Sequence, residues 1–283
     1  MIDLKEKRKI RKMLEEDVGP GDITTKSVVS PDTISKAEVI AKQSGILAGA
    51  AEAKVAFKEM GVKAEAVKKD GARINVGDIV MKVEGPAYGI LAAERTALNL
   101  MTRMSGVATA TKKMIDIARE VNLKVKIAAT RKTAPLLTSF DKRAVQIAGG
   151  EPHRFCLNDF ILIKDNHLKL VGSVAEAVRR ARKNGSSSKI EVEVNHLEDC
   201  LEAVKSGADV IMLDNFEALE VERTIETLKK SGLRDQIIIE ASGGIDPSNV
   251  REYAAAGVDI ISSSYMTMQA PALDMGLEIN AGG

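Results

Sequence analysis

The chain has 283 residues, of which 45% are hydrophobic, and this is enough for a large core and for two domains. Its 41 basic and 40 acidic residues nearly cancel, so the overall charge does not attract nucleic acid or a membrane surface. Aromatic residues make up only 3% and tryptophan is absent, which argues against stacking platforms for bases.

The two cysteines indicate a reducing compartment, and the N-terminal segment does not resemble a signal peptide. Cys156 and Cys200 are far apart and lack the spacing of metal ligands, which argues against a disulfide framework. Segment 1–8 is charged and has no apolar core of the kind found in signal peptides. No apolar run approaches the roughly 20 residues that a membrane helix needs. We therefore expect a soluble, cytoplasmic protein.

The first third of the chain predicts a small α+β domain followed by a long helix. The short elements that we expect are a helix over 3–16, a strand over 37–41, a helix over 49–60, and strands over 62–67 and 78–83. A helical stretch follows over about 91–119, because Leu98, Met101 and other apolar residues recur along one stripe. Gly106 interrupts this stretch, so two helices are also compatible with it. We expect the domain boundary in this region.

After residue 120, short apolar β-rich runs alternate with helical segments. Six runs are clear, namely 124–129, 160–163, 189–194, 210–213, 236–239 and 258–261. We expect one helix to begin after Ser173, in a capping box, and another at Asp246-Pro247, an acidic cap followed by proline. Alternating β and α units predict a parallel sheet covered by helices. The pattern favours an α/β fold with an open or incomplete TIM-like barrel over a doubly wound sheet.

Polar residues follow each of these runs, at the strand ends where parallel sheets and barrels bind ligands. The early strands and the loop between them bring cations, the middle strands bring acids, and the late strands bring glycine and serine. These residues are Arg131, Lys132, His153, Arg154 and Lys164; then Glu193, Asp214 and Glu240; then Ser242, Gly243, Gly244, Ser263 and Ser264. Backbone N–H groups of Gly/Ser loops can bind a phosphate. The pattern predicts a ligand with several anionic groups, one of them a terminal phosphate.

Several of these residues have simpler alternative roles. Arg131 could equally be a solvated helix start, and His153 taken alone favours a structural role slightly. His167 has an alternative role in pinning the loop after Lys164. Glu191 and Glu193 alternate with valine and therefore share one face of their strand, where an unpaired acid is costly. Glu193, nearer the strand end, is interpreted as functional and Glu191 as paired structurally.

Motifs for other chemistry are absent from the sequence. It has no Gly-x-Ser-x-Gly elbow, zinc-ligand spacing, Rossmann fingerprint or P-loop. The conjunction of polar strand ends is therefore the main functional signal.

These residues belong to sequence blocks that resemble a known family. The blocks are Glu94-Arg95-Thr96, Ser105-Gly106-Val107-Ala108-Thr109, Thr130-Arg131-Lys132-Thr133, Gly149-Gly150-Glu151-Pro152-His153-Arg154, Lys164-Asp165-Asn166-His167, Glu191-Val192-Glu193-Val194, Met212-Leu213-Asp214-Asn215 and Ala241-Ser242-Gly243-Gly244. In this order and spacing they resemble the quinolinate phosphoribosyltransferases, also called carboxylating nicotinate-nucleotide pyrophosphorylases. The resemblance covers nearly the whole chain.

The resemblance implies a homodimer of two-domain subunits with a shared active site. We expect an N-terminal α+β domain over 1–110, with segment 270–283 packing back on it, and an open α/β barrel over 111–269. The implied reaction belongs to NAD biosynthesis. It joins quinolinate to phosphoribosyl pyrophosphate in the presence of Mg2+ and yields nicotinate mononucleotide, CO2 and pyrophosphate.

The resemblance also implies which residues form the site. Quinolinate would be bound by Thr130, Arg131, Lys132, His153, Arg154 and Lys164, with Arg95 supplied by the neighbouring subunit. The phosphoribosyl group would be bound by Glu193, Asp214, Ser242, Gly243, Gly244, Ser263, Ser264 and Tyr265. The catalytic residues would be Lys132, Lys164, Glu193 and Asp214, of which Glu193 and Asp214 could also hold Mg2+. The cations suit a substrate with two carboxylates, because guanidinium groups bind carboxylates bidentately.

One departure and two alternatives remain open. Many family members carry a histidine where this chain has Met268, which places the detailed phosphate contacts in doubt. A related pyrophosphorylase acting on another pyridine acid or on a nucleobase is one alternative, although the surplus of cations favours quinolinate over nicotinate. A non-catalytic barrel that binds a sugar phosphate is the other.

Overall fold

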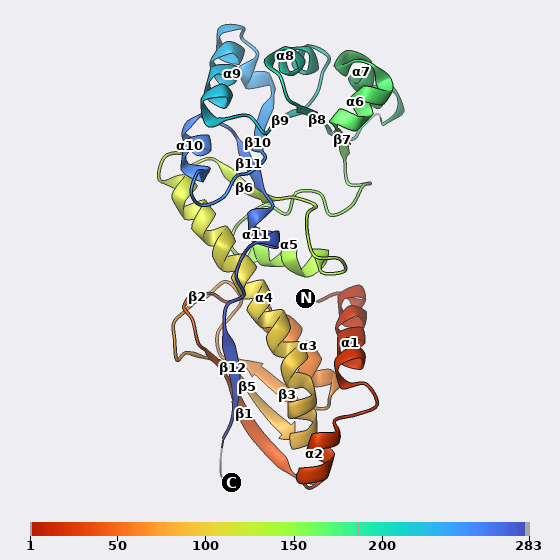
Figure 1. Ribbon diagram of the computed structural model, residues 1–283, viewed down its shortest axis with the longest axis vertical. Helices are drawn as coiled ribbons and strands as arrows, with labels where there is room; N and C mark the ends of the chain where they lie inside the picture. Colours follow the sequence, from red (N-terminus) through yellow and green to blue (C-terminus); the bar gives the residue numbers. More distant parts are fainter. Residues whose placement is uncertain (1, 186, 281–283) are drawn as a thin grey trace. The chain divides into compact units, whose positions relative to one another are not determined.

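A computed structural model describes residues 2–185 and 187–280 and divides the chain into two compact units (Figure 1). Unit 1 comprises the residues up to Ala110, the segment Ser139–Ala148 and the residues from Ala270 onward; unit 2 comprises Thr111–Thr138 and Gly149–Gln269. We expected residues 139–148 in the second domain, whereas they belong to unit 1. None of the described helices is both long enough and apolar enough to cross a membrane.

Unit 1 is built on a four-stranded antiparallel sheet with the strand order β12-β1-β5-β3. Its strands are β1 (Ile34–Ala41), β3 (Lys63–Ala66), β5 (Ile79–Pro86) and β12 (Met275–Ile279), beside a small sheet of β2 (Gly45–Ile46) and β4 (Arg73–Ile74). Its helices are α1 (Leu4–Val18), α2 (Ile23–Val28), α3 (Ala50–Glu59) and most of α4 (Ala87–Arg119). The last strand of the chain, β12, thus pairs with the first strand, β1.

Helix α4 runs from Ala87 to Arg119 without a break, so the expectation of an interruption at Gly106 was wrong. The glycine has a packing role instead. A Cβ atom at Gly106 would lie 2.2 Å from the carbonyl oxygen of Pro271. The absence of a side chain therefore allows the returning C-terminal segment to approach the helix backbone within unit 1.

Buried charges explain why segment 139–148 belongs to unit 1. This segment forms most of α5 (Thr138–Ile147). Arg103 donates two hydrogen bonds of 2.8 Å to the fully buried carboxylate of Asp141. The Nε atom of Arg143 lies 3.1 Å from Glu52, which is also fully buried. Because burial is only partly offset by Arg143, the pKa of Glu52 rises to about 7.

Unit 2 contains a parallel sheet of six strands in the order β6-β11-β10-β9-β8-β7. The strands are β6 (Lys126–Ala129), β7 (Ile161–Ile163), β8 (Ile190–Val194), β9 (Val210–Asp214), β10 (Ile238–Ser242) and β11 (Ile260–Ser263). All six runs expected from the sequence are strands. The parallel α/β sheet confirms the predicted fold class, an open TIM-like barrel of fewer than eight strands together with an N-terminal α+β unit.

Helices follow the strands of unit 2 and cover one face of the sheet (Figure 1). They are α6 (Asp165–Val171), α7 (Val174–Asn184), α8 (Leu197–Lys205), α9 (Ala218–Lys230), the short 3-10 helix η1 (Arg234–Gln236), α10 (Val250–Ala255) and α11 (Tyr265–Met268). Ser173 caps α7 as expected, by accepting from the Glu176 N–H.

The expected helix start at Asp246-Pro247 was wrong. The Asp246 carboxylate accepts from the Ser248 N–H at 2.7 Å and closes a turn. The helix α10 therefore begins only at Val250, after Asn249.

Alternation along the strands separates the core from the interior of the barrel. On β8, Ile190, Val192 and Val194 pack in the hydrophobic core that includes the covering helices. The intervening Glu191 and Glu193 point to the opposite face, as strand geometry requires. Met212 of β9 is in register with Glu193 on one side and with Glu240 of β10 on the other. Acidic side chains thus enter the face of the sheet that the helices do not cover.

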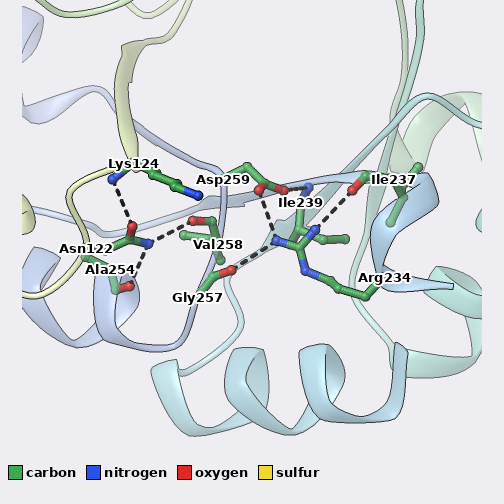
Figure 2. A network of polar contacts seen from close by, with 9 residues as sticks. All are labelled: Asn122, Lys124, Arg234, Ile237, Ile239, Ala254, Gly257, Val258 and Asp259. Carbon is green, nitrogen blue, oxygen red and sulfur yellow. Dashed lines mark hydrogen bonds and ion pairs between the residues drawn. The ribbon is translucent and has the colours of Figure 1, made fainter. Parts of the chain in front are cut away.

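The opposite ends of the strands are closed by an arginine–aspartate clamp (Figure 2). Arg234 contacts Asp259 at 3.0 Å and also donates to the carbonyl oxygens of Ile237 and Gly257. The second oxygen of Asp259 accepts from the Ile239 N–H at 2.8 Å. This clamp ties the start of β10 to the start of β11.

A second clamp of the same design joins β8 to β9. Arg182 contacts Asp209 at 2.6 Å and donates to the carbonyl oxygen of Gly207. Asp209 accepts from the Ile190 N–H at 2.7 Å. Since both aspartates follow a glycine two residues earlier, the chain uses the same local device at two strand pairs.

Candidate active site

Two adjoining cavities open at the carboxyl ends of the parallel strands in unit 2. The larger has a volume of about 470 Å³ and the smaller about 200 Å³. They share five lining residues, which are Thr130, Lys132, Asp214, Ser242 and Ser262. Every site residue expected from the sequence lines one of the two cavities, with the single exception of Arg95. The larger cavity holds the cations, and the smaller one holds the Gly/Ser loops.

The cationic wall of the larger cavity is formed by residues that follow β6 and precede β7. Arg131 and Lys132 are exposed, whereas Arg154 is only 5% exposed. The guanidinium carbon of Arg154 lies 5.8 Å from the centroid of the Phe160 ring. Burial and the neighbouring charge of Arg131 hold the pKa of Arg154 below its ordinary value. A cluster of positive charge that is partly desolvated favours an anionic ligand.

Lys164 and Glu193 form an ion pair in the wall of the same cavity. Lys164 Nζ lies 2.5 Å from a Glu193 oxygen. Directly after β7, the Lys164 N–H donates to Nδ1 of His167 at 2.9 Å. His167 therefore pins the loop that carries Lys164, which is the structural role that the sequence suggested for it.

Asp214 ends β9 at the border between the two cavities. Burial, followed by repulsion from Glu193, raises its pKa above the ordinary value for aspartate. Asn215 donates to the Asp214 carboxylate at 2.7 Å, and its own N–H donates to the Ser242 carbonyl oxygen at 2.8 Å. Asn215 adopts a left-handed conformation with φ 59°, which asparagine tolerates. Sequence reasoning had assigned no role to this residue.

The smaller cavity is lined by backbone from the loops after β10 and β11. Gly243 has φ 102°, and a Cβ atom there would lie 2.3 Å from Asn215 Oδ1. Only glycine fits this position, because both the conformation and the contact exclude a side chain. In the other loop, the Tyr265 N–H donates to Ser263 Oγ at 3.0 Å. These features form a compact polar pocket of the size and character that suit a phosphate.

Met268 lies at the end of α11, and 56% of its surface is exposed. The preceding residue, Thr267, donates through Oγ1 to the Lys132 carbonyl oxygen at 2.7 Å. The segment that departs from the family pattern is therefore tied to the cationic loop through Thr267, while the methionine side chain itself points to solvent.

His153 enters the larger cavity with two buried glutamates beside it. Its Nε2 atom lies 3.4 Å from Glu191 and 3.5 Å from Glu240. Burial lowers the pKa of His153, but the two carboxylates outweigh this effect and raise the pKa to about 9. Glu191 thus has a charged partner, in keeping with its interpretation as a paired acid.

Several lining residues were missed by sequence reasoning. Leu162 and Met212 give the larger cavity apolar surface, and Ser262 lies between the two cavities. Each occupies a strand position that alternates with core residues. The alternation could have identified them, but only once the inward face of each strand was known.

Arg95 lies on α4 in unit 1, with a side chain that is 63% exposed and 4.0 Å from Glu94. Its expected role in the active site of a second subunit stays a prediction, because the structure describes a single chain.

The sequence of the chain matches two family models that together span nearly all of it. Residues 22–105 match the N-terminal domain of quinolinate phosphoribosyl transferase, and residues 107–278 match its C-terminal domain. The chain belongs to the quinolinate phosphoribosyltransferase family.

Full-length relatives support this membership. The probable carboxylating nicotinate-nucleotide pyrophosphorylase of Methanothermobacter thermautotrophicus is 44% identical, over 95% of this chain and 97% of that protein. The protein of the same name from Archaeoglobus fulgidus is 46% identical, over 92% of this chain and 98% of its own length. The solved structure of the nicotinate-nucleotide pyrophosphorylase from Francisella tularensis has a TM-score of 0.91 at 32% identity, covering 99% and 98% of the two chains. Sequence and fold therefore agree, and the resemblance seen in the motifs is confirmed.

Proposed function

We propose that this quinolinate phosphoribosyltransferase family member transfers the phosphoribosyl group of phosphoribosyl pyrophosphate to quinolinate. The products are nicotinate mononucleotide, CO2 and pyrophosphate, in a step of NAD biosynthesis. The observation that carries the proposal is the pairing of the two cavities: a cation-rich one sized for a small aromatic diacid adjoins a Gly/Ser pocket suited to a phosphate. The family membership supplies the identity of both substrates.

The larger cavity matches quinolinate in charge and in polarity. Arg131 and Arg154 can each bind a carboxylate through two parallel hydrogen bonds. Lys132 and His153 add further cationic donors. Leu162 and Met212 offer apolar surface to the pyridine ring. A ligand with two carboxylates on an aromatic ring uses all of these groups, whereas a monocarboxylate leaves part of the positive charge unpaired.

In this reaction the protein positions the two substrates and stabilises the charge that develops on them. The ring nitrogen of the substrate attacks C1′ of the ribose while pyrophosphate leaves, so the protein needs no nucleophile of its own. The carbon gains positive charge in the transition state, as in glycosyl transfer. Asp214 lies at the border of the two cavities and Glu193 lines the larger one, so either carboxylate can face this charge or bind ribose hydroxyls. One well-placed electrostatic contact of this kind is worth roughly 3 kcal/mol.

Lys164 then has a role beside Glu193. Its ammonium already contacts that carboxylate at 2.5 Å. It is therefore placed to orient Glu193 and to bind the substrate carboxylate from the same position. The carboxylate next to the ring nitrogen leaves as CO2 once the ring is a pyridinium, because the positive nitrogen stabilises the electron pair that stays on the adjacent ring carbon. That carbon then takes up a proton from solvent.

We propose Mg2+ as the metal of the reaction, held by Glu193 and Asp214 together with substrate. Mg2+ usually takes one or two carboxylates and completes its shell with substrate phosphates and water. The carboxylates of Glu193 and Asp214 match this preference, because both line the larger cavity. Burial and then repulsion from Glu193 raise the pKa of Asp214, and a bound cation would relieve that repulsion. When bound, the ion would neutralise the charge of the departing pyrophosphate. Among the described residues, Glu193 and Asp214 are not part of a cluster of three candidate ligands, so the substrate would have to complete the site.

We further propose a cytoplasmic homodimer in which Arg95 of one subunit completes the quinolinate site of the other. The exposed arginine on α4 supports this, because an unburied guanidinium with one distant partner is available to a second chain.

The experiment that tests the proposed function is a pyrophosphate-release assay with Mg2+ and phosphoribosyl pyrophosphate. We expect turnover with quinolinate and little with nicotinate. Equal rates, or activity on nicotinate alone, would favour the related pyrophosphorylase. Binding of phosphoribosyl pyrophosphate without turnover of any pyridine acid would favour a non-catalytic sugar-phosphate sensor.

A further inference from the structure

A histidine and two glutamates meet inside the parallel sheet, beside the groups that the reaction uses. His153 precedes β7, Glu191 lies on β8, and Glu240 lies on β10. The two glutamates are 2% and 1% exposed. Oxygen atoms on both carboxylates, and the His153 Nε2 atom, have no hydrogen-bond partner of normal geometry. The distances of 3.4 and 3.5 Å from Nε2 are those of ion pairs shared between two acids.

This cluster must hold a proton, either on the imidazole or on a carboxyl group, since burial raises the pKa of Glu191 above its ordinary value. Two carboxylates that are buried near one another cannot both remain ionised beside a neutral imidazole, because burial and mutual repulsion disfavour the charges. A protonated imidazole lying between them supplies the missing charge without a further group. The two acids outweigh the effect of burial on the imidazole and raise the pKa of His153 to about 9.

The imidazole ring is also held in place mechanically. The His153 backbone has φ 51°, in the left-handed region that residues other than glycine seldom adopt. Its ring meets the Phe160 ring edge-on, with centroids 5.2 Å apart and planes at 71°. Because Nε2 faces the two glutamates, Nδ1 is the nitrogen left for a ligand. His153 lines the larger cavity, where such a ligand would lie.

We propose that Glu240 and Glu191 are positioning residues that hold His153 as a fixed imidazolium, whose Nδ1–H binds a carboxylate of the acceptor substrate. The identity of that acceptor as quinolinate rests on the proposed function. The two glutamates would not touch the substrate themselves. They act through the histidine, by fixing its orientation and by keeping it a donor at both nitrogens.

Other charged groups share this environment and bear on any pH dependence. Arg154 follows His153 in the chain and lies over the same Phe160 ring. Arg131 and Lys132 line the cavity from the loop after β6, and Asp214 lines it from β9. Lys164 and Glu193 line it as an ion pair. The positive groups among them disfavour protonation of His153. The two buried glutamates must therefore be the groups that raise its pKa.

The direct test is a histidine titration by NMR, which is tractable because the chain has only three histidines. The signal of His153 is assigned by its loss in His153→Gln. We expect it to remain protonated at pH 8 and to titrate near 9 in the unaltered protein. In Glu240→Gln its midpoint should fall by about one unit or more. Titration near the ordinary value of 6.5 in the unaltered protein would overturn the proposal without reliance on any variant.

Glu151→Gln is the matched control. Glu151 is two residues from His153 in the chain but pairs with Lys126 at 3.2 Å. It should leave the His153 midpoint unchanged, and an equal shift in both variants would reduce the effect to one of general charge and contradict the proposal.

Steady-state kinetics separate positioning from a merely structural role. Glu240→Gln should raise the KM for quinolinate roughly tenfold, with the KM for phosphoribosyl pyrophosphate unchanged, and the defect should grow as pH rises. A uniform loss of kcat at constant KM would contradict the proposal. Because the titration does not depend on turnover, a protein whose His153 titrates near 9 but which ignores quinolinate would refute the proposed function and not the imidazolium.

A divalent cation in place of the proton is the remaining outcome. Nitrogen and carboxylate oxygens of the three side chains all lie within 4.8 Å of one another. Elemental analysis of the dialysed protein should find no stoichiometric metal that Glu240→Gln removes. Finding such a metal would overturn the proposal.

Discussion

Arg154 shows at the scale of one residue how burial and shape combine in the substrate cavity. Its guanidinium is almost fully buried, yet it lines the cavity and lies over an aromatic ring. A guanidinium can bind a carboxylate through two parallel bonds, and a lysine cannot. We therefore expect Arg154→Lys to keep the charge but to raise the KM for quinolinate about 10- to 100-fold, in line with the loss of one charged hydrogen bond.

The matched control for this variant is Arg251→Lys, on an exposed arginine that pairs with Glu120. Initial rates at varied quinolinate and varied phosphoribosyl pyrophosphate give the two KM values. A change in the second KM as large as in the first would show that Arg154 does not serve the quinolinate cavity.

Glu52 gives a residue-scale prediction about stability. Its pKa is raised to about 7 in the folded protein, from an ordinary value of 4.5, chiefly by burial. A raised carboxyl pKa means that the folded state binds the extra proton, so the contribution to stability is present below pH 4.5 and is lost as pH rises through 7. Glu52→Gln should remove this slope, which is on the order of 1–3 kcal/mol across that window.

Urea unfolding from pH 4 to pH 8 measures the effect. Glu84→Gln is the control, because Glu84 is half exposed and pairs with Lys36 at 3.3 Å. If Glu52→Gln and the unaltered protein lose stability in parallel between pH 4.5 and 7, the assignment to Glu52 fails.

At the scale of elements, the two arginine–aspartate clamps fix the starts of neighbouring strands. Arg234 is 15% exposed, and Asp259 accepts both from it and from the Ile239 N–H (Figure 2). Asp259→Asn weakens the pair and places an N–H group or a neutral oxygen where a carboxylate accepted. Charged hydrogen bonds of this kind contribute about 1.5–3 kcal/mol, so we expect a loss of free energy of unfolding in that range.

The same substitution in the second clamp, Asp209→Asn, should cost a similar amount, because Asp209 has the same contacts. Glu120→Gln, which removes only a surface pair, should cost less than about 1 kcal/mol. Equal losses in all three variants, measured by urea unfolding, would show that the clamps are ordinary surface ion pairs.

The elements also show what could be predicted from the sequence. The six parallel strands were predictable, because each is a short apolar run in a regular β/α alternation. The expectations at Gly106 and Asp246 were wrong, because close packing against Pro271 explains the glycine and a turn closed by Ser248 follows the aspartate. The place of α5 in unit 1 was not predictable, since it depends on buried pairs such as Arg103 with Asp141 that lie far apart in the sequence.

The candidate site divides in the same way. Its members could be named from polar strand ends and family motifs, and all of them except Arg95 line the two cavities. The contacts between these side chains could not be predicted from the sequence. Glu240 on β10 contacts His153, which lies in the loop before β7, and this contact follows only from the strand order of the sheet and the inward face of each strand. Periodicity shows which residues share a face, but it does not show which faces meet.

At the scale of the whole molecule, the prediction concerns sharing of the site between subunits. Arg95→Ala and Arg131→Ala should each be nearly inactive alone. If Arg95 acts in the partner's site, mixed dimers of the two variants contain one intact site, and random exchange should restore about a quarter of the full activity.

Exchange must be verified by pull-down of differently tagged subunits, and unmixed variants serve as controls. Verified heterodimers without any recovered activity would show that Arg95 does not complete a neighbouring site.

The central claim is that the two cavities bind quinolinate and a phosphoribosyl donor for one decarboxylating transfer. Carboxyl-labelled quinolinate, incubated with phosphoribosyl pyrophosphate and Mg2+, tests it by the yields of CO2 and pyrophosphate. We predict equal amounts of the two, and neither product when one substrate is omitted. Pyrophosphate release without CO2, or with nicotinate as readily as with quinolinate, would contradict the account.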